Sequence, residues 1–215
     1  MNQYKLKYQL NTSYFNTIDT EDKSYFLGFI AADGCITADE QRNNYRLKIQ
    51  ICSIDEHILH SFCSYLGSNK PIERGHFSGY SNGKEQSKLA INSKPLVSAL
   101  ISHDIHPRKS LTLTYPDECI DSHFIRGYFD GDGCLYTCDS RPQIEILGTE
   151  SFLTSINSRI PSPGRVSLKT DKLYRLRITK KQHAIDFLQY IYLDSTIKLD
   201  RKYQKAISFI CQDAS

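Results

Sequence analysis

Two aspartates end two similar apolar segments, and their spacing suggests a shared chemical role. The segment FLGFIAADGCI (26–36) recurs as IRGYFDGDGCL (125–135), so Asp33 and Asp132 lie 99 residues apart (132 − 33) in a chain of 215. Carboxylate oxygens suit Mg²⁺, and a divalent metal can activate a water nucleophile and stabilise a leaving oxygen. The pattern predicts two related halves that bring two acids to one metal-dependent site acting on two similar targets.

Each segment would carry a strip of very small residues if it were helical. Gly28 and Ala32 are four positions apart, as are Gly127 and Gly131. Two helices that meet along such strips can approach closely, because no side chain separates their backbones. The glycine after each aspartate suits the left-handed conformation that ends many helices. A helix stop would explain one Asp-Gly, whereas two matched copies favour two aspartates that meet where the helices end.

Further helices and strands repeat with the same period. Polar and apolar residues alternate along several stretches, which is typical of antiparallel sheets with one buried and one accessible face. Ser53 or Asp55, and Thr149, could cap the helices that follow. The expected strands are 44–51, 88–92, 141–146, 165–169 and 174–179, and the expected later helices are 55–66, 94–102, 150–160, 181–192 and 199–211. We therefore predict an α+β protein with two αββαββα repeats that form concave antiparallel sheets, divided into halves 1–118 and 119–215.

The charge distribution points to a polyanion. The net charge is only +3, but seven basic residues and one acid lie between Arg165 and Lys181. Such a run can be a solvated face that confers solubility. Its strand-like alternation favours contact with a polyanion instead.

Cysteine usage and hydropathy indicate a reducing compartment and no membrane span. The seven cysteines are an odd number and scattered, which is typical of free thiols. Cys35 and Cys134 occupy equivalent places in the repeat, which suits small buried side chains. No apolar run approaches the roughly 18–20 residues that a membrane helix needs, and no secretory signal is visible. We expect an intracellular, cytoplasmic protein.

Both segments resemble the motif of the LAGLIDADG homing endonucleases. The nine motif positions read FLGFIAADG (26–34) and IRGYFDGDG (125–133), and PRKSLTL and LDRKY are similar to phrases of bacterial and phage-type members. The resemblance covers nearly the whole chain, because αββαββα is the core of that family. It implies a single-chain, monomeric endonuclease that uses Mg²⁺ to cut both strands of a long double-stranded DNA site. It also implies a function in intron homing in a bacterial or phage-infected cell.

The resemblance implies roles for the matching residues of both motifs. Asp33 and Asp132, at the eighth motif position, would be catalytic and bind metal, and the backbone carbonyls of Ala32 and Gly131 would help to coordinate it. The sixth position is Asp130 in the second motif and Ala31 in the first, a departure that matters little if the later carboxylate is the catalytic one.

Two further roles follow from the same resemblance. Lys109 and Lys202, in matched Arg-Lys pairs, would lie near the scissile phosphates, although phosphate anchors or surface charges are equally compatible with the sequence. A water-orienting polar residue would stand at the end of each long strand, near Ser53 in one half and near Gly148 in the other. Glycine cannot supply that function in the second half.

The polar faces of the strands would read the duplex. Major-groove base edges carry a donor and acceptor code that Arg, Lys, Gln, Asn and Glu can read, and other cations hold phosphates. The predicted DNA-binding residues are Arg46, Lys48, Gln50, Lys88, Asn92, Arg141, Gln143, Glu145, Arg165, Lys169, Arg175, Arg177 and Thr179.

Two other classes of protein compete with the nuclease. One is a non-cleaving nucleic-acid binder on the same scaffold, either an RNA maturase or a transcription regulator. The presence of both motif aspartates favours the nuclease over that class. The other is a structural duplication with an unrelated ligand, and the basic alternating strands argue against it.

Overall fold

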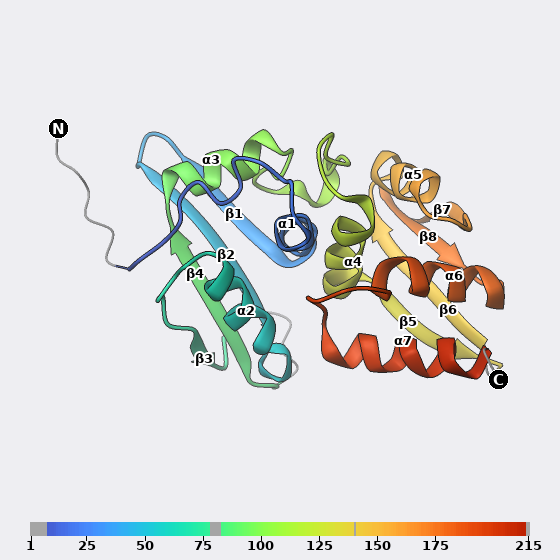
Figure 1. Cartoon of the computed structure of the whole chain (residues 1–215). Coiled ribbons are helices and arrows are strands. Elements are labelled where there is room, and N and C mark those ends of the chain that lie inside the picture. Colours follow the sequence, from blue (N-terminus) through green and yellow to red (C-terminus); the bar gives the residue numbers. More distant parts are fainter. Residues whose placement is uncertain (1–7, 78–82, 140, 214–215) are drawn as a thin grey trace.

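The chain folds into two similar halves, each built on one four-stranded antiparallel sheet. The computed structural model describes residues 8–77, 83–139 and 141–213. Figure 1 shows the N-terminal half in blue and green and the C-terminal half in yellow and red, with α1 (Glu21–Asp33) and α4 (Asp121–Asp132) between them. The predicted α+β repeat is therefore confirmed.

The two halves have the same order of elements. The first continues after α1 with β1 (Gly34–Asp39), β2 (Asn44–Cys52), α2 (His57–Tyr65), β3 (Glu73–Gly75), β4 (Gln86–Asn92) and α3 (Lys94–Ser102). The second continues after α4 with β5 (Cys134–Cys138), β6 (Arg141–Gly148), α5 (Glu150–Arg159), β7 (Arg165–Thr170), β8 (Leu173–Ile178), α6 (Lys181–Tyr192) and α7 (Asp200–Asp213). The strand orders, β1-β2-β4-β3 and β5-β6-β8-β7, are equivalent.

One hydrophobic core runs through both halves and includes residues of α1 and α4. The predicted alternation holds in β2 and β6, where every second residue is buried. It fails in β7, because Leu168 is 58% exposed and the register shifts between Leu168 and Thr170 on this edge strand. Within the described ranges, no helix is both long enough and apolar enough to cross a membrane.

The expectation that Cys35 and Cys134 are buried was wrong. Both thiols are exposed, because they lie on the polar face of their strands. The next residues, Ile36 and Leu135, take the buried side. The two cysteines thus have equivalent surroundings, as their equivalent places in the repeat predicted. They lie on the polar side of each sheet, however, and not on the buried side.

Of the two predicted helix caps, one is present and the other is absent. The Thr149 hydroxyl caps α5 as predicted, accepting a hydrogen bond from the Phe152 N–H at 3.2 Å. Neither Ser53 nor Asp55 caps α2, because both lie in a short 3₁₀ turn (Ser53–Asp55) before the helix. The Ser53 hydroxyl instead donates to the carbonyl of Glu85 at 3.1 Å.

The central helices α1 and α4 are in direct backbone contact, as their small residues predicted. A Cβ added at Gly28 would lie 2.0 Å from the carbonyl oxygen of Phe124, and one at Gly127 would lie 1.9 Å from that of Tyr25. Any larger side chain at either glycine would separate the helices. The close approach brings the two helix C-termini to the same place.

The predicted reason for the two glycines that follow the helices, a left-handed backbone, was wrong. Gly34 and Gly133 have φ of −75° and −74°, so neither is left-handed. A Cβ on either would instead lie 2.6 Å from a carbonyl oxygen of the preceding turn, that of Ile30 or Phe129. Glycine is needed because each helix turns directly into a strand.

Candidate active site

Two carboxylates lie at the adjacent C-termini of α1 and α4. Asp33 ends α1 and Asp132 ends α4. A Cβ added at Gly131 would lie 2.4 Å from the Ala32 Cβ and 3.2 Å from Oδ2 of Asp33, so the carboxylate of one helix lies against the end of the other. The structure therefore brings together the two acids and the two preceding residues that the sequence predicted.

The pKa values of both acids are raised. Burial, and then the negative charge of Asp132, raise the pKa of Asp33 to about 6. Burial also raises the pKa of Asp132. The charges of Lys109 and Lys202 oppose both shifts without cancelling them. Two partly desolvated acids beside each other form a place where a cation would be stabilised.

The two predicted lysines lie beside these acids and bind backbone carbonyls. The Lys109 ammonium donates to the carbonyl of Gly34. The Lys202 ammonium donates to the equivalent carbonyl of Gly133 at 2.5 Å and to two carbonyls of the last turn of α4 at 2.6 and 2.9 Å. Burial lowers the pKa of Lys202 to about 8 and also lowers that of Lys109. Lys202 is only 7% exposed, because its ammonium group is enclosed by backbone carbonyls at the end of α4.

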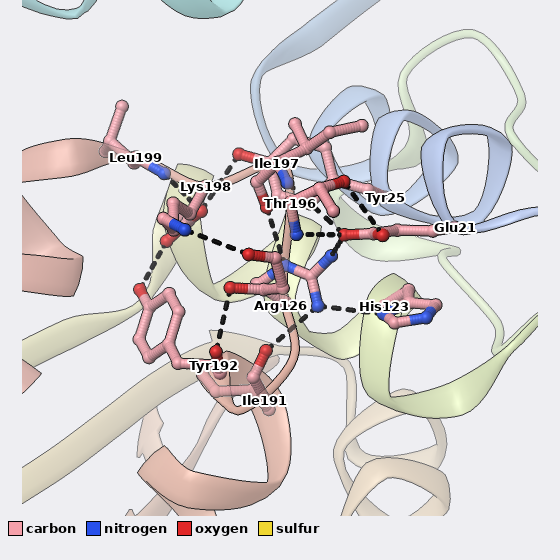
Figure 2. Close-up of polar contacts among 12 residues, drawn as sticks. Glu21, Tyr25, His123, Arg126, Ile191, Tyr192, Thr196, Ile197, Lys198 and Leu199 are labelled. Carbon is pink, nitrogen blue, oxygen red and sulfur yellow. Dashed lines mark hydrogen bonds and ion pairs between the residues drawn. The ribbon is translucent and has the colours of Figure 1, made fainter. Parts of the chain in front are cut away.

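A buried arginine that the sequence analysis did not single out holds the segment leading into α7. Figure 2 shows Arg126 among groups of both halves. Its Nε donates to the carbonyl of Ile197 at 2.8 Å, Nη1 to that of Ile191 at 2.9 Å, and Nη2 to Glu21 of α1 at 2.6 Å. The Glu21 carboxylate also accepts from the N–H of Thr196 at 2.8 Å and from its hydroxyl at 2.9 Å.

Asp130, at the sixth position of the second motif, completes this anchor. Its carboxylate accepts hydrogen bonds from the hydroxyls of Tyr25 at 2.9 Å and Tyr192 at 2.5 Å, and from the N–H of Leu199 at 2.8 Å. Leu199 precedes α7, and α7 carries Lys202. The network therefore fixes the helix that brings this lysine to the centre.

One sequence signal could have revealed the network. Arg126 and Asp130 are charged residues inside an otherwise apolar helix, at positions where the first motif has Leu27 and Ala31. A buried charge is costly unless it is paired and hydrogen-bonded. Two such charges on one apolar helix therefore indicate a structural polar cluster.

Cavities flank the carboxylates on two sides. One, of about 300 Å³, is lined by Asp33 and by the predicted DNA contact Gln50. The other, of about 210 Å³, is lined by Asp132 and Gly148. Ser53, expected near a reacting water, does not line the first cavity. Gln50 and Gln86 line that cavity instead.

The other predicted DNA contacts of the C-terminal sheet form polar pairs. Glu145 binds Lys169 at 2.7 Å and Arg175 at 3.7 Å. Arg177 donates from Nη2 to the Tyr136 hydroxyl at 3.2 Å and to Gln143 at 3.3 Å. Arg141, Arg165 and Thr179 are exposed, and Thr179 lies just beyond the end of β8.

The N-terminal sheet presents fewer charges and more amides. Arg46 donates to the Asn92 side chain at 2.8 Å, and Lys88 forms an ion pair with Glu73 at 2.8 Å. Lys48 is half-buried on the same face. The two polar faces are thus both suited to nucleic acid, with the stronger positive charge on the C-terminal one.

The donor set fits a hard cation that keeps much of its own hydration. Among the described residues, no group of three or more His, Cys, Asp or Glu side chains could hold a metal. Mg²⁺ is usually held by one or two carboxylates together with waters and phosphate oxygens. Asp33 and Asp132 would provide the carboxylates, with the carbonyls of Ala32 and Gly131 beside them. The Gly131 carbonyl also faces the Lys202 ammonium at 3.5 Å.

The chain is similar to solved structures of LAGLIDADG meganucleases and homing endonucleases. I-AabMI bound to uncleaved DNA is 14% identical (TM-score 0.58; 88% of this chain and 90% of that one). I-LtrWI bound to target DNA is 11% identical (TM-score 0.59; 95% and 92%). I-SmaMI bound to uncleavable DNA is 12% identical (TM-score 0.55; 87% and 88%). No protein-family model and no curated protein matches the sequence. The chain has the LAGLIDADG homing endonuclease fold, in its single-chain form with two motifs.

Proposed function

We propose that the protein is a site-specific, double-strand DNA endonuclease of the LAGLIDADG family. The observation that carries the proposal is the meeting of Asp33 and Asp132 at the adjacent ends of α1 and α4. Two polar sheet faces extend from this centre, and three structures of the same fold were solved with DNA bound. The partner would be double-stranded DNA inside a cell, and the chain would act as a monomer because both acids belong to it.

Hydrolysis of a phosphodiester requires an activated water and a stabilised leaving oxygen. When bound, Mg²⁺ would supply both. Asp33 and Asp132 would hold the cation. Their raised pKa values reflect the cost of placing two negative charges here, and the cation would neutralise those charges. Lys109 and Lys202 would limit the repulsion between the acids in its absence. The sheets would hold the duplex so that one phosphate of each strand reaches the helix ends.

The test begins with a duplex selected from a randomised double-stranded library by the purified full-length chain. We expect Mg²⁺ to support cleavage of both strands of that duplex, and EDTA to abolish it. The Asp33→Asn, Asp132→Asn double variant should bind the duplex and cut neither strand. Asp194→Asn is the matched control, because Asp194 is exposed and its left-handed backbone suits asparagine.

Three results would contradict the proposal. Full cleavage by the double Asn variant would show that the reaction takes place elsewhere. Binding without cleavage by the unmodified chain would indicate a non-cleaving binder on this fold. Preference for RNA over the selected DNA would indicate the maturase class.

A further inference from the structure

The two cavities beside the acids occupy equivalent places in the repeat. The residue two past each motif aspartate pairs with Lys48 in β2 and with Glu145 in β6. Two positions further along these strands are Gln50 and Leu147, so these two residues correspond to each other. Each lines the cavity of its own half.

The neighbouring strand repeats the same contrast. Gln50 pairs with Lys88 in β4, and Leu147 pairs with Arg175 in β8. The residue two positions before each partner is a glutamine, Gln86, in the first half and a leucine in the second. That leucine, the first residue of β8, lines the cavity beside Asp132 as Gln86 lines the one beside Asp33.

The cavity beside Asp33 can orient a water molecule. Gln50 donates from Nε2 to Oε1 of the buried Gln86 at 2.7 Å. This bond fixes the Gln50 amide and keeps its carbonyl oxygen as an acceptor for a water proton. Arg201, which binds Asp55 at 3.0 Å and 3.1 Å, adds a positive charge to the same lining.

The cavity beside Asp132 lacks this arrangement. Its lining includes Leu113, Leu147 and Leu173. The Tyr128 hydroxyl in that lining donates its hydrogen to the carbonyl of Leu147 at 2.9 Å. Besides Asp132 and Tyr128, Ser110 brings a polar side chain to this cavity. In the second half, no amide side chain occupies the positions that correspond to Gln50 and Gln86.

We infer that the active centre is unequal, and that the strand attacked in the cavity beside Asp33 is cut before the strand attacked beside Asp132. The inference rests on the nuclease function proposed above. In each cut the water oxygen bonds to phosphorus, the phosphorus–ester oxygen bond breaks, and one water proton ends on the leaving oxygen. A misplacement of ~1 Å can cost about 100-fold in rate. Gln50 restricts the position of the attacking water, and Leu147 cannot.

Strand-resolved cleavage of a supercoiled plasmid carrying the selected duplex tests the order. We expect nicked circles to accumulate before linear DNA, with the nicks on a single strand. Gln50→Leu should slow the cut in that strand by about 10- to 100-fold and leave the other strand's rate unchanged. The reciprocal variant, Leu147→Gln, should accelerate the second cut. Melting temperature, measured without divalent metal, should match the unmodified chain for both variants, and the cutting rates are compared in single turnovers with the duplex saturated by protein, so that a change in affinity does not enter them.

The outcomes separate the inference from the function beneath it. Equal initial nicking of the two strands, or equal slowing of both strands by Gln50→Leu, overturns the inference and leaves the nuclease function standing. A chain that binds the duplex and cuts neither strand overturns the nuclease function, and the strand order with it. A loss of melting temperature in Gln50→Leu that accounts for its slower cutting would also overturn the assigned role of Gln50.

Discussion

Replacing Asp33 by asparagine should stabilise the protein at neutral pH, although it removes a predicted catalytic group. The carboxylate lies in a partly desolvated place beside the charge of Asp132, and both effects raise its pKa from 3.8 to about 6. Asparagine has nearly the same shape and no charge to desolvate. The variant therefore keeps the packing of the helix end and loses the electrostatic cost.

The size and the pH dependence of the gain follow from the shift. A rise of about two units in pKa corresponds to about 3 kcal/mol. The folded Asp33 carboxyl binds its proton more tightly than the unfolded one. Both states are protonated below about pH 4, so the cost is absent there; it grows as the pH rises to about 6 and is complete above that. The difference in stability between variant and parent should therefore grow as the pH rises from about 4 to about 6.

Urea unfolding between about pH 2 and pH 8 without divalent metal measures the difference in the free energy of unfolding. At neutral pH this difference corresponds to a rise of about 6–12 °C in melting temperature. Glu56→Gln is a control of opposite sign. Hydrogen bonds from Arg74, among other partners, lower the pKa of Glu56 to about 2. That variant should lose stability at neutral pH, and its loss should fade as the pH falls through the range from 4.5 towards 2.

Two results would refute this reasoning about Asp33. One is a variant no more stable than the parent at pH 7. The other is a gain of the same size at every pH, which would show that it has a cause other than ionisation. Mg²⁺ should raise the stability of the parent more than that of the variant, because a ligand that binds only the folded state stabilises it.

Two further predictions concern the helix interface and the DNA face. Gly127→Ala places a Cβ 1.9 Å from the Tyr25 carbonyl oxygen, so it should lower the free energy of unfolding by at least about 1–3 kcal/mol. Gly75→Ala, whose Cβ would have its nearest neighbour at 3.6 Å, should change it little; equal melting of the two variants would show that the helices do not meet as described. Arg177→Ala should weaken DNA binding, by about 1–3 kcal/mol if the side chain reads a base, or with a salt dependence reduced by about one unit of slope if it holds a phosphate. Fluorescence anisotropy titrations over a range of salt concentrations distinguish the base contact from the phosphate contact. Unchanged affinity at every salt concentration would show that Arg177 does not contact DNA.

The sequence by itself determined the repeat, the element types and most of the sheet faces. The predicted helices 94–102 and 181–192 match α3 and α6, and the Thr149 cap is present as expected. These features are local: a cap bonds an N–H three residues away, and a period-2 pattern sorts neighbouring side chains between core and solvent. The matched glycines also predicted the contact of α1 and α4, because only backbones can meet at that distance.

The tertiary structure alone decided how the centre is assembled. Asp130 receives hydrogen bonds from residues 105, 62 and 69 positions away in the chain. Gln50 lines the cavity beside Asp33, where the resemblance led us to expect Ser53, and its partner Gln86 comes from a different strand. Lys202 is buried among carbonyls although lysine is usually exposed. Partners this distant leave no local pattern, since they depend on where whole elements come to lie.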